Sequence, residues 1–239
     1  MDIPVELYAP YGAPPNELKE DFLKNAAQSQ FRKNGYSQAK ALQPAWIALV
    51  EILNRIEKQP YHWPVGRTIF QKIAYISTRE GLPTGLNYQK GSFGPFAANL
   101  KNLTAQLINN NLLMEERMGK MFMVKVGPGY NKVRDQYANQ LSLWENIIDK
   151  TMDLFLRINT NQAEIVATVI YTVDQLINNA NRKPTELEVL NSVMQWKQKR
   201  RPPLNKQEVA SNIRNLGMLR WLSTIPSPEF NVITEDIAS

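Results

Sequence analysis

Residues 118–129 read MGKMFMVKVGPG, and this stretch decides the fold of the first half of the chain. Residues 121–126 have the composition of a strand, and the Met-Gly-Lys before them is typical of a hairpin turn. The Gly-Pro-Gly at 127–129 ends the unit. Three helical patterns precede this hairpin. Three helices followed by a small hairpin is the order of a winged-helix domain.

The three helical patterns have clear ends. The first runs from residue 42 to Pro60, and the second covers 68–80 and stops at Gly81. The third is expected to begin near Pro95, because proline is favoured in the first turn of a helix. Apolar residues recur at helical spacing in all three patterns. They are Leu42, Trp46, Leu49, Leu53, Ile56, Ile69, Ile73, Ile76, Phe96, Leu100, Leu103 and Leu107.

The second half is predicted to be helical again. Residues 137–155 indicate one long or broken helix, and three capping signals indicate three more, the last ending at Gly217. These signals are Asn161 with Glu164, Thr185 with Glu188, and Asn205 with Glu208. The expected fold class is therefore mainly α. Residues 42–130 would form a winged-helix-like subdomain and residues 131–239 a helical subdomain with a tail, for which a second winged helix is an alternative.

The first 41 residues differ in character from the rest. Residues 3–8 alternate like one short strand, residues 16–27 indicate a short polar helix, and residues 28–41 have the composition of a linker. A single strand is not stable alone. It must pair with a later part of the chain, or it belongs to a domain outside this chain.

Composition excludes several classes of protein. The chain has 239 residues and no cysteine, which rules out a disulfide framework, a zinc ribbon and a thiol nucleophile. No apolar run approaches the roughly 20 residues of a membrane span, and the N-terminus lacks a signal peptide's regions. We expect a cytoplasmic protein with no membrane contact.

Motifs for catalysis are missing. His62 is the only histidine, and it stands between two aromatic residues, a setting more typical of packing than of catalysis. The acidic pairs Glu115–Glu116 and Asp149–Asp153 come without a second polar cluster. The glycine loops lack the pattern of a phosphate cradle. We therefore expect a non-enzymatic chain without catalytic residues, metal, cofactor or small-molecule ligand.

The positive charge is concentrated in one segment. The chain carries a net charge of +6, and residues 182–220 hold nine Lys or Arg against three Asp or Glu. Lys199, Arg200, Arg201 and Arg214 are candidates for contact with DNA phosphates or with an acidic protein. A solvated helical surface is the alternative interpretation. The linker between the two flanking helices is longer than a helix-turn-helix turn and contains two prolines.

Two stretches together resemble a known family. Residues 66–75 read GRTIFQKIAY, and residues 90–100 read KGSFGPFAANL. They resemble the C-terminal, toxin-neutralising domain of DarG antitoxins, with phenylalanine at Phe93 and Phe96 where that family has tyrosine. The resemblance continues more weakly through residues 164–169, 193–196 and 217–222, so it spans about 42–222.

The resemblance implies a function by binding. DarG domains of this kind bind DarT, a DNA ADP-ribosyltransferase toxin, and follow a macrodomain that removes ADP-ribose from DNA. Residues 5–10 look like the last strand of such a macrodomain, so we expect a fragment that begins there. The contact surface would be the loop 88–96 and the helix start after it. Its candidate residues are Tyr88, Lys90, Phe93, Pro95, Phe96 and Asn99.

The charge balance leaves a second hypothesis open. A domain that covers a toxin's DNA groove by mimicking DNA should be acidic, whereas this chain is basic. A local patch of Glu115, Glu116, Asp149 and Asp153 could still supply acidity. The alternative is a winged-helix DNA-binding protein, such as a transcriptional autoregulator, with the basic segment on phosphate.

Overall fold

A computed structural model describes residues 42–119 and 121–230 of the chain. The predicted strand at 5–8, the helix at 16–27 and the linker at 28–41 lie outside the described residues. From Gln43 onward the described residues belong to one compact unit. It is mainly helical with small antiparallel hairpins, which confirms the mainly α fold class.

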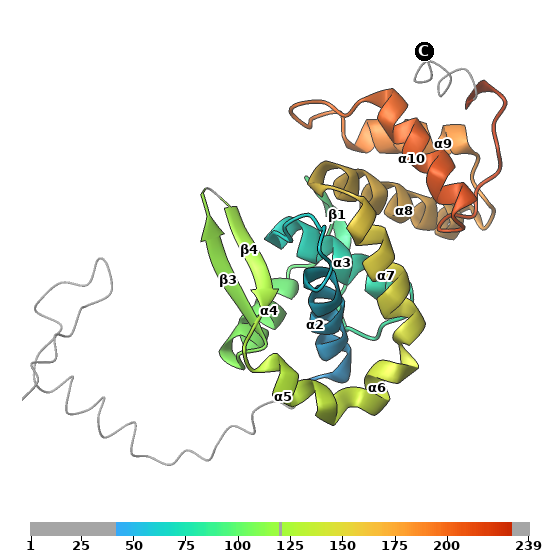
Figure 1. The fold of residues 1–239 in the computed structure, drawn as a ribbon. Helices are drawn as coiled ribbons and strands as arrows, with labels where there is room; N and C mark the ends of the chain where they lie inside the picture. Colours follow the sequence, from blue (N-terminus) through green and yellow to red (C-terminus); the bar gives the residue numbers. More distant parts are fainter. Residues whose placement is uncertain (1–41, 120, 231–239) are drawn as a thin grey trace, which may run out of the picture. The chain divides into compact units, whose positions relative to one another are not determined.

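The first half has the winged-helix order (Figure 1). Its elements are α2 (Pro44–Glu57), α3 (Arg67–Arg79), α4 (Leu100–Asn109), β3 (Leu113–Met118) and β4 (Met121–Val126). β3 and β4 pair antiparallel, from Leu113 opposite Val126 to Met118 opposite Met121. The segment before α3 lies along β4, since Gly66 bridges to Met123 and the Val124 amide donates to the Val65 carbonyl at 2.8 Å. One bridge and one hydrogen bond thus fix this segment beside the β3–β4 hairpin.

The prediction that a helix begins near Pro95 is wrong. Residues 89–96 form a second hairpin, β1 (Gln89–Gly91) and β2 (Gly94–Phe96), in which Lys90 lies opposite Pro95. Proline is tolerated here because the two-stranded hairpin has only edge strands, which do not need every N–H. Gly94 also has φ of +92°, a conformation that does not lead into a right-handed helix. The helix begins at Leu100 instead.

The regular elements in the described part of the second half are helices. Its elements are α5 (Tyr130–Arg134), the 3₁₀ turn η2 (Asp135–Tyr137), α6 (Ala138–Leu143), α7 (Glu145–Arg157), α8 (Thr160–Ala180), α9 (Glu186–Trp196) and α10 (Lys206–Met218). The pattern over 137–155 thus corresponds to a helix broken at Trp144. Between residues 131 and 230 the structure contains no hairpin, only a parallel bridge between Thr185 and Ile225. The described part of this half therefore has no wing after its helices.

The capping predictions are confirmed in part. Thr185 and Glu188 form the predicted reciprocal capping box at the start of α9. At the start of α10, the Asn205 side chain accepts a hydrogen bond from the Glu208 backbone amide, as predicted. α8, in contrast, is capped by Asn159 with Gln162, two residues earlier than predicted. Asn161 is already inside the helix, which frees Glu164 for a different role described below. α10 passes through Gly217 and ends at Met218, because Arg220 takes the left-handed conformation, with φ of 60°.

The two halves share a packing core. α2 is buried around most of its circumference and packs against α7, while α3 packs against both α7 and α8 (Figure 1). Polar and aromatic contacts reinforce this arrangement. Arg79 of α3 pairs with Asp174 of α8, and the Tyr75 and Tyr171 rings lie 6.1 Å apart. Within the described ranges, no helix has the length and apolar character needed to cross a membrane.

Candidate partner-binding site

A tight hairpin presents the most exposed aromatic side chain of the predicted contact region. We call residues 88–99 the Phe93 loop. Ser92 and Phe93 form the turn between β1 and β2, and the Phe93 side chain is 65% exposed. Gly94, beside it, lies against α8. A Cβ at this position would come within 2.9 Å of the Thr168 hydroxyl, so the close approach requires glycine.

Two buried lysines hold the underside of the loop. Lys72 of α3 is only 1% exposed, and its ammonium donates to the Pro95 carbonyl at 2.9 Å. Lys197, just after α9, donates to the Ser92 carbonyl at 2.6 Å. Both acceptors are backbone atoms of the hairpin. The tip of the loop is therefore fixed by side chains from α3 and from the residue after α9, and its shape does not depend on its own short strands alone.

A buried carboxylate completes this support. Glu164 of α8 is 4% exposed and accepts from Lys197 at 2.8 Å and from Arg200 at 3.2 Å. Arg200 also donates to the Asn161 side chain. Burial by itself would raise the pKa of Glu164, but the hydrogen bonds from Lys197 and Arg200 outweigh it and lower that pKa. The carboxylate is thus charged at neutral pH and compensates the buried lysine.

The structure separates the predicted contact residues into two groups. Pro95 is buried, and Tyr88 points inward, with its ring edge-on to Tyr75 at 5.0 Å between centroids. Lys90, Phe93, Phe96 and Asn99 are exposed. Lys90 also lies 5.3 Å from the centre of the Trp196 ring. The outward-facing group is the part of the prediction that a partner can reach.

The basic segment after α9 contacts the Phe93 loop, although the two are about a hundred residues apart in the chain. The Lys197–Ser92 hydrogen bond and the Lys90–Trp196 contact join the two predicted regions directly. As a phosphate-binding patch, however, the segment is weaker than predicted. Arg200 is paired with Glu164, and Arg214 is paired with Glu186 at 2.8 Å. Lys199 and Arg201 remain exposed.

The predicted acidic patch does not form. Glu115 pairs with Arg67, and Glu116 pairs with Lys125. The other two acidic residues are also in ion pairs, since Asp149 lies against Arg55 and Asp153 against Arg157. Each of the four charges is thus neutralised by a neighbouring cation. Electrostatic mimicry of DNA by these residues has no basis in this arrangement.

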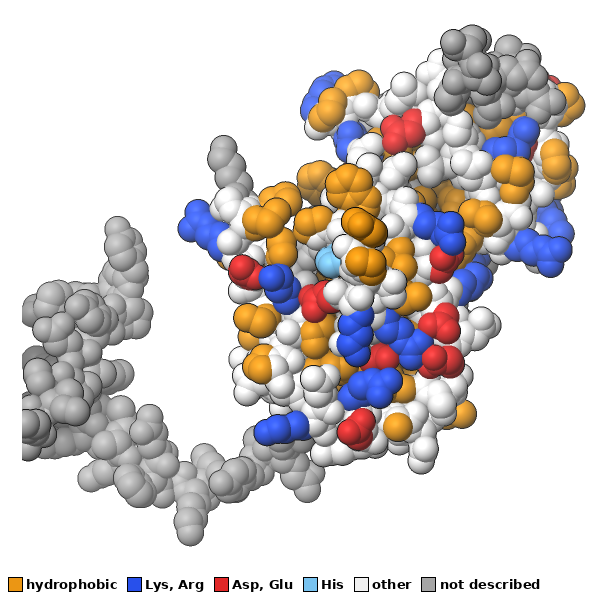
Figure 2. All heavy atoms as spheres, in the orientation of Figure 1, with side chains coloured by type: hydrophobic (Ala, Val, Ile, Leu, Met, Phe, Trp, Pro, Cys, Tyr) orange, Lys and Arg blue, Asp and Glu red, His pale blue; other side chains and the backbone are white. Residues whose placement is uncertain are grey.

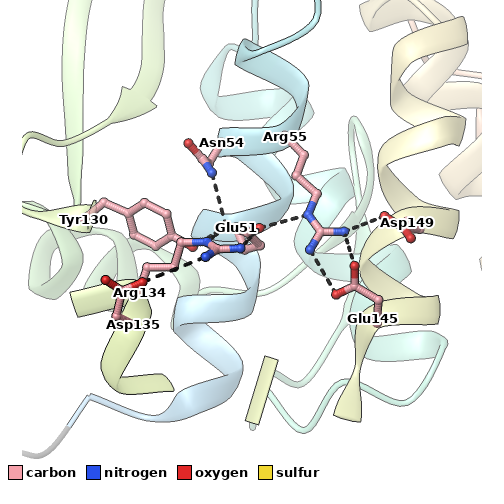
Figure 3. A network of polar contacts seen from close by, with 8 residues as sticks. All are labelled: Glu51, Asn54, Arg55, Tyr130, Arg134, Asp135, Glu145 and Asp149. Atoms are coloured by element: carbon pink, nitrogen blue, oxygen red, sulfur yellow. Dashed lines mark hydrogen bonds and ion pairs between the residues drawn. The ribbon is translucent and has the colours of Figure 1, made fainter. Parts of the chain in front are cut away.

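A second buried polar network joins α2 to α5 and α7. Glu51 of α2 accepts from Asn54, Arg55, Tyr130 and Arg134, and Arg55 continues to Glu145 and Asp149 (Figure 3). In Figure 3, Glu51 lies at the centre of its four donors, and Glu145 and Asp149 lie on the far side of Arg55. Every polar group at this centre is satisfied, which is typical of a structural network.

The lone histidine is outside both networks. His62 is exposed, and its Nδ1 lies 3.1 Å from the Trp63 carbonyl oxygen. Across residues 42–119 and 121–230, no three His, Cys, Asp or Glu side chains come together in a group that could hold a metal ion.

Comparison with known proteins adds no relative. No model of a known protein family matches the chain, and no curated protein matches it either.

Lys72, which holds the Phe93 loop, should make the stability of the protein rise at alkaline pH. Burial, together with nearby Lys197, lowers the pKa of Lys72 from 10.5 to about 8. Between these values the unfolded chain holds more protons than the folded one, so stability rises with pH. We expect the free energy of unfolding to increase by about 2 kcal/mol from pH 8 to 10.

Urea unfolding of the wild type and of Lys72→Met at pH 8, 9 and 10 tests this prediction. The variant should show a much flatter dependence, with the remaining rise due to Lys197, whose pKa burial also lowers. Equal slopes in the two proteins would mean that Lys72 stays protonated when folded.

Proposed function

We propose that this chain is a non-catalytic binding domain that neutralises a DarT-like DNA ADP-ribosyltransferase in the cytoplasm by attaching to it. The proposal joins the resemblance of residues 66–75 and 90–100 to DarG with one structural observation. That observation is the Phe93 loop, an exposed aromatic residue on a backbone held by buried Lys72 and Lys197.

Pre-organisation is the physical reason that such a loop suits a protein interface. Ordering a free loop on binding costs free energy, which a loop already fixed by Glu164, Lys72 and Lys197 avoids. Aromatic anchors that fill a partner's pocket contribute most to affinity. Lys90 of the same loop is an exposed cation, as are Lys199 and Arg201 of the basic segment, and they fit an acidic face on the toxin.

Inhibition would then be steric. A domain seated on the toxin over its DNA groove prevents the substrate from reaching the groove and needs no chemistry of its own. The proposal assigns the reversal of DNA modification to a macrodomain in a longer parent protein.

The test is co-expression with a DarT-like DNA ADP-ribosyltransferase, followed by co-purification and an assay of DNA modification. We expect a stable complex in which modification is blocked. Phe93→Ser should weaken the complex by about tenfold or more, because it removes the anchor. Leu143→Ser is the matched control, since Leu143 is 78% exposed on α6, and it should leave affinity unchanged.

Two results would contradict the proposal. One is a chain that forms no complex with the toxin. The other is binding to duplex DNA that falls steeply with salt, which would indicate phosphate contacts and a DNA-binding role.

A further inference from the structure

A groove opens beside the Phe93 loop, between α4 and the β3–β4 hairpin. Its volume is about 370 Å³, and its walls are mostly apolar. The apolar residues that line it include Phe96, Ala97, Ala105, Ile108 and Val124. Phe96 belongs to β2, so the groove and the Phe93 loop share a wall. The two surfaces are therefore continuous.

One face of α4 is left open along this groove. Lys101, Thr104, Ala105 and Ile108 line it and are spaced three and four residues apart, so they form one stripe along the helix. The stripe is about 10 Å long, at 1.5 Å per residue. Its small side chains at the centre leave room for side chains of a second helix.

Aromatic and hydrophobic residues extend the surface beyond the groove. Phe122 of β4 is 41% exposed, and the Arg67 guanidinium lies 4.2 Å from the centre of its ring. Figure 2 shows a further gathering of hydrophobic side chains on the face turned to the viewer, where Figure 1 places β1 and α3. An exposed aromatic side chain next to an apolar groove, as Phe122 is through its contact with Arg67, is typical of a site for a protein partner.

The rim of the groove carries a positive charge. The charged residues at the rim are Arg67, Lys101 and Glu115, and Glu115 forms an ion pair with Arg67. Lys101 is exposed, and no Asp or Glu of the described ranges lies within ion-pair distance of it. α4 itself contains no acidic residue. An occupant with acidic residues beside an apolar stripe complements this rim.

We propose that this groove binds an acidic amphipathic helix of the protein partner, with apolar residues at i, i+3 or i+4 in the groove and a carboxylate on Lys101. The inference rests on the proposed function, because it assigns a second contact to the same toxin. The mode is a helix laid in a groove. The Phe93 loop would hold the partner at one end of this contact.

The groove fits DNA poorly, although α4 occupies the position of the recognition helix in the winged-helix order. Recognition helices reach into the major groove with polar and basic side chains that contact bases and phosphates. The open stripe of α4 offers Lys101 as its one cation, next to Ala105 and Ile108.

Binding of the purified toxin to groove variants tests the inference. Ala105→Trp fills the groove, and Lys101→Glu reverses the rim charge. Both positions are exposed, so we expect the fold to persist, which thermal unfolding would check. Each change should weaken binding about tenfold, or about 1.4 kcal/mol. Asn102→Glu, on the next exposed position outside the groove, is the control and should stay within about twofold of wild type.

The outcomes separate this inference from the proposed function. If the wild type binds the toxin and Phe93→Ser weakens it while both groove variants bind normally, the groove inference is wrong and the proposed function stands. If the wild type binds no toxin, both are wrong. If the groove variants lose affinity for duplex DNA and keep it for the toxin, α4 reads DNA and the groove does not hold a protein helix.

Discussion

Glu164→Gln is expected to destabilise the protein by about 3 kcal/mol and to loosen the Phe93 loop. The substitution leaves the ammonium of Lys197, which is 4% exposed, without its charged partner. Removing one member of a buried ion pair costs about 3–5 kcal/mol, because the remaining charge is uncompensated. Lys197 also donates to the Ser92 carbonyl, so a shift of Lys197 would loosen the turn that carries Phe93.

Two measurements check this prediction. Urea unfolding should give the lower stability, and hydrogen exchange should become faster for the amides of residues 90–96. Asp153→Asn is the matched control, because Asp153 pairs with Arg157 on the exposed surface of α7. An exposed pair contributes only about 0–1 kcal/mol. Equal losses in the two variants would show that Glu164 does not support the loop.

The helices could be predicted from sequence because their signals are local. Apolar spacing located α2 and α3, and the Thr185–Glu188 pair located the start of α9. A capping box and an apolar stripe are both properties of a few neighbouring residues. The β3–β4 hairpin was visible for the same reason, since its turn and strands are contiguous.

Two of the wrong predictions, for Pro95 and Glu164, arose where a local signal was compatible with more than one structure. Pro95 suits a first helical turn and equally an edge strand, and the positive φ of Gly94 decides between them. Glu164 fits the third position of a capping box, but its carboxylate forms ion pairs with Lys197 and Arg200 instead. Those partners lie more than thirty residues away, where no local pattern can indicate them.

The buried charges left a trace in the sequence that only the fold explains. Lys72 falls among Ile69, Ile73 and Ile76, and Lys197 follows Val189 and Val193 at four-residue spacing. A lysine on an apolar stripe indicates a buried or partly buried charge. What it cannot indicate is the acceptor, because the Pro95 and Ser92 carbonyls come from another part of the chain.

The second large effect is expected at the centre of the first half, for Glu51→Gln. Burial would raise the pKa of Glu51, but hydrogen bonds from Arg134, Tyr130 and Arg55 lower it from 4.5 to about 2. Glu51 is 2% exposed, so the substitution leaves the half-buried Arg134 and Arg55 without the negative charge that they share. We expect the variant to lose about 3 kcal/mol of stability at pH 7.

The same residue sets a pH dependence of known sign. A carboxyl with a lowered pKa stabilises the fold fully above 4.5, and this contribution is lost as the pH falls toward 2. Unfolding free energies measured from pH 6 to 2.5 should therefore fall more steeply in wild type than in Glu51→Gln. Glu145→Gln, at the exposed rim of the network, is the control and should cost no more than about 1 kcal/mol. If Glu51→Gln and Glu145→Gln match at pH 7, the network in Figure 3 does not hold α2 against α5 and α7, and hydrophobic packing alone does so.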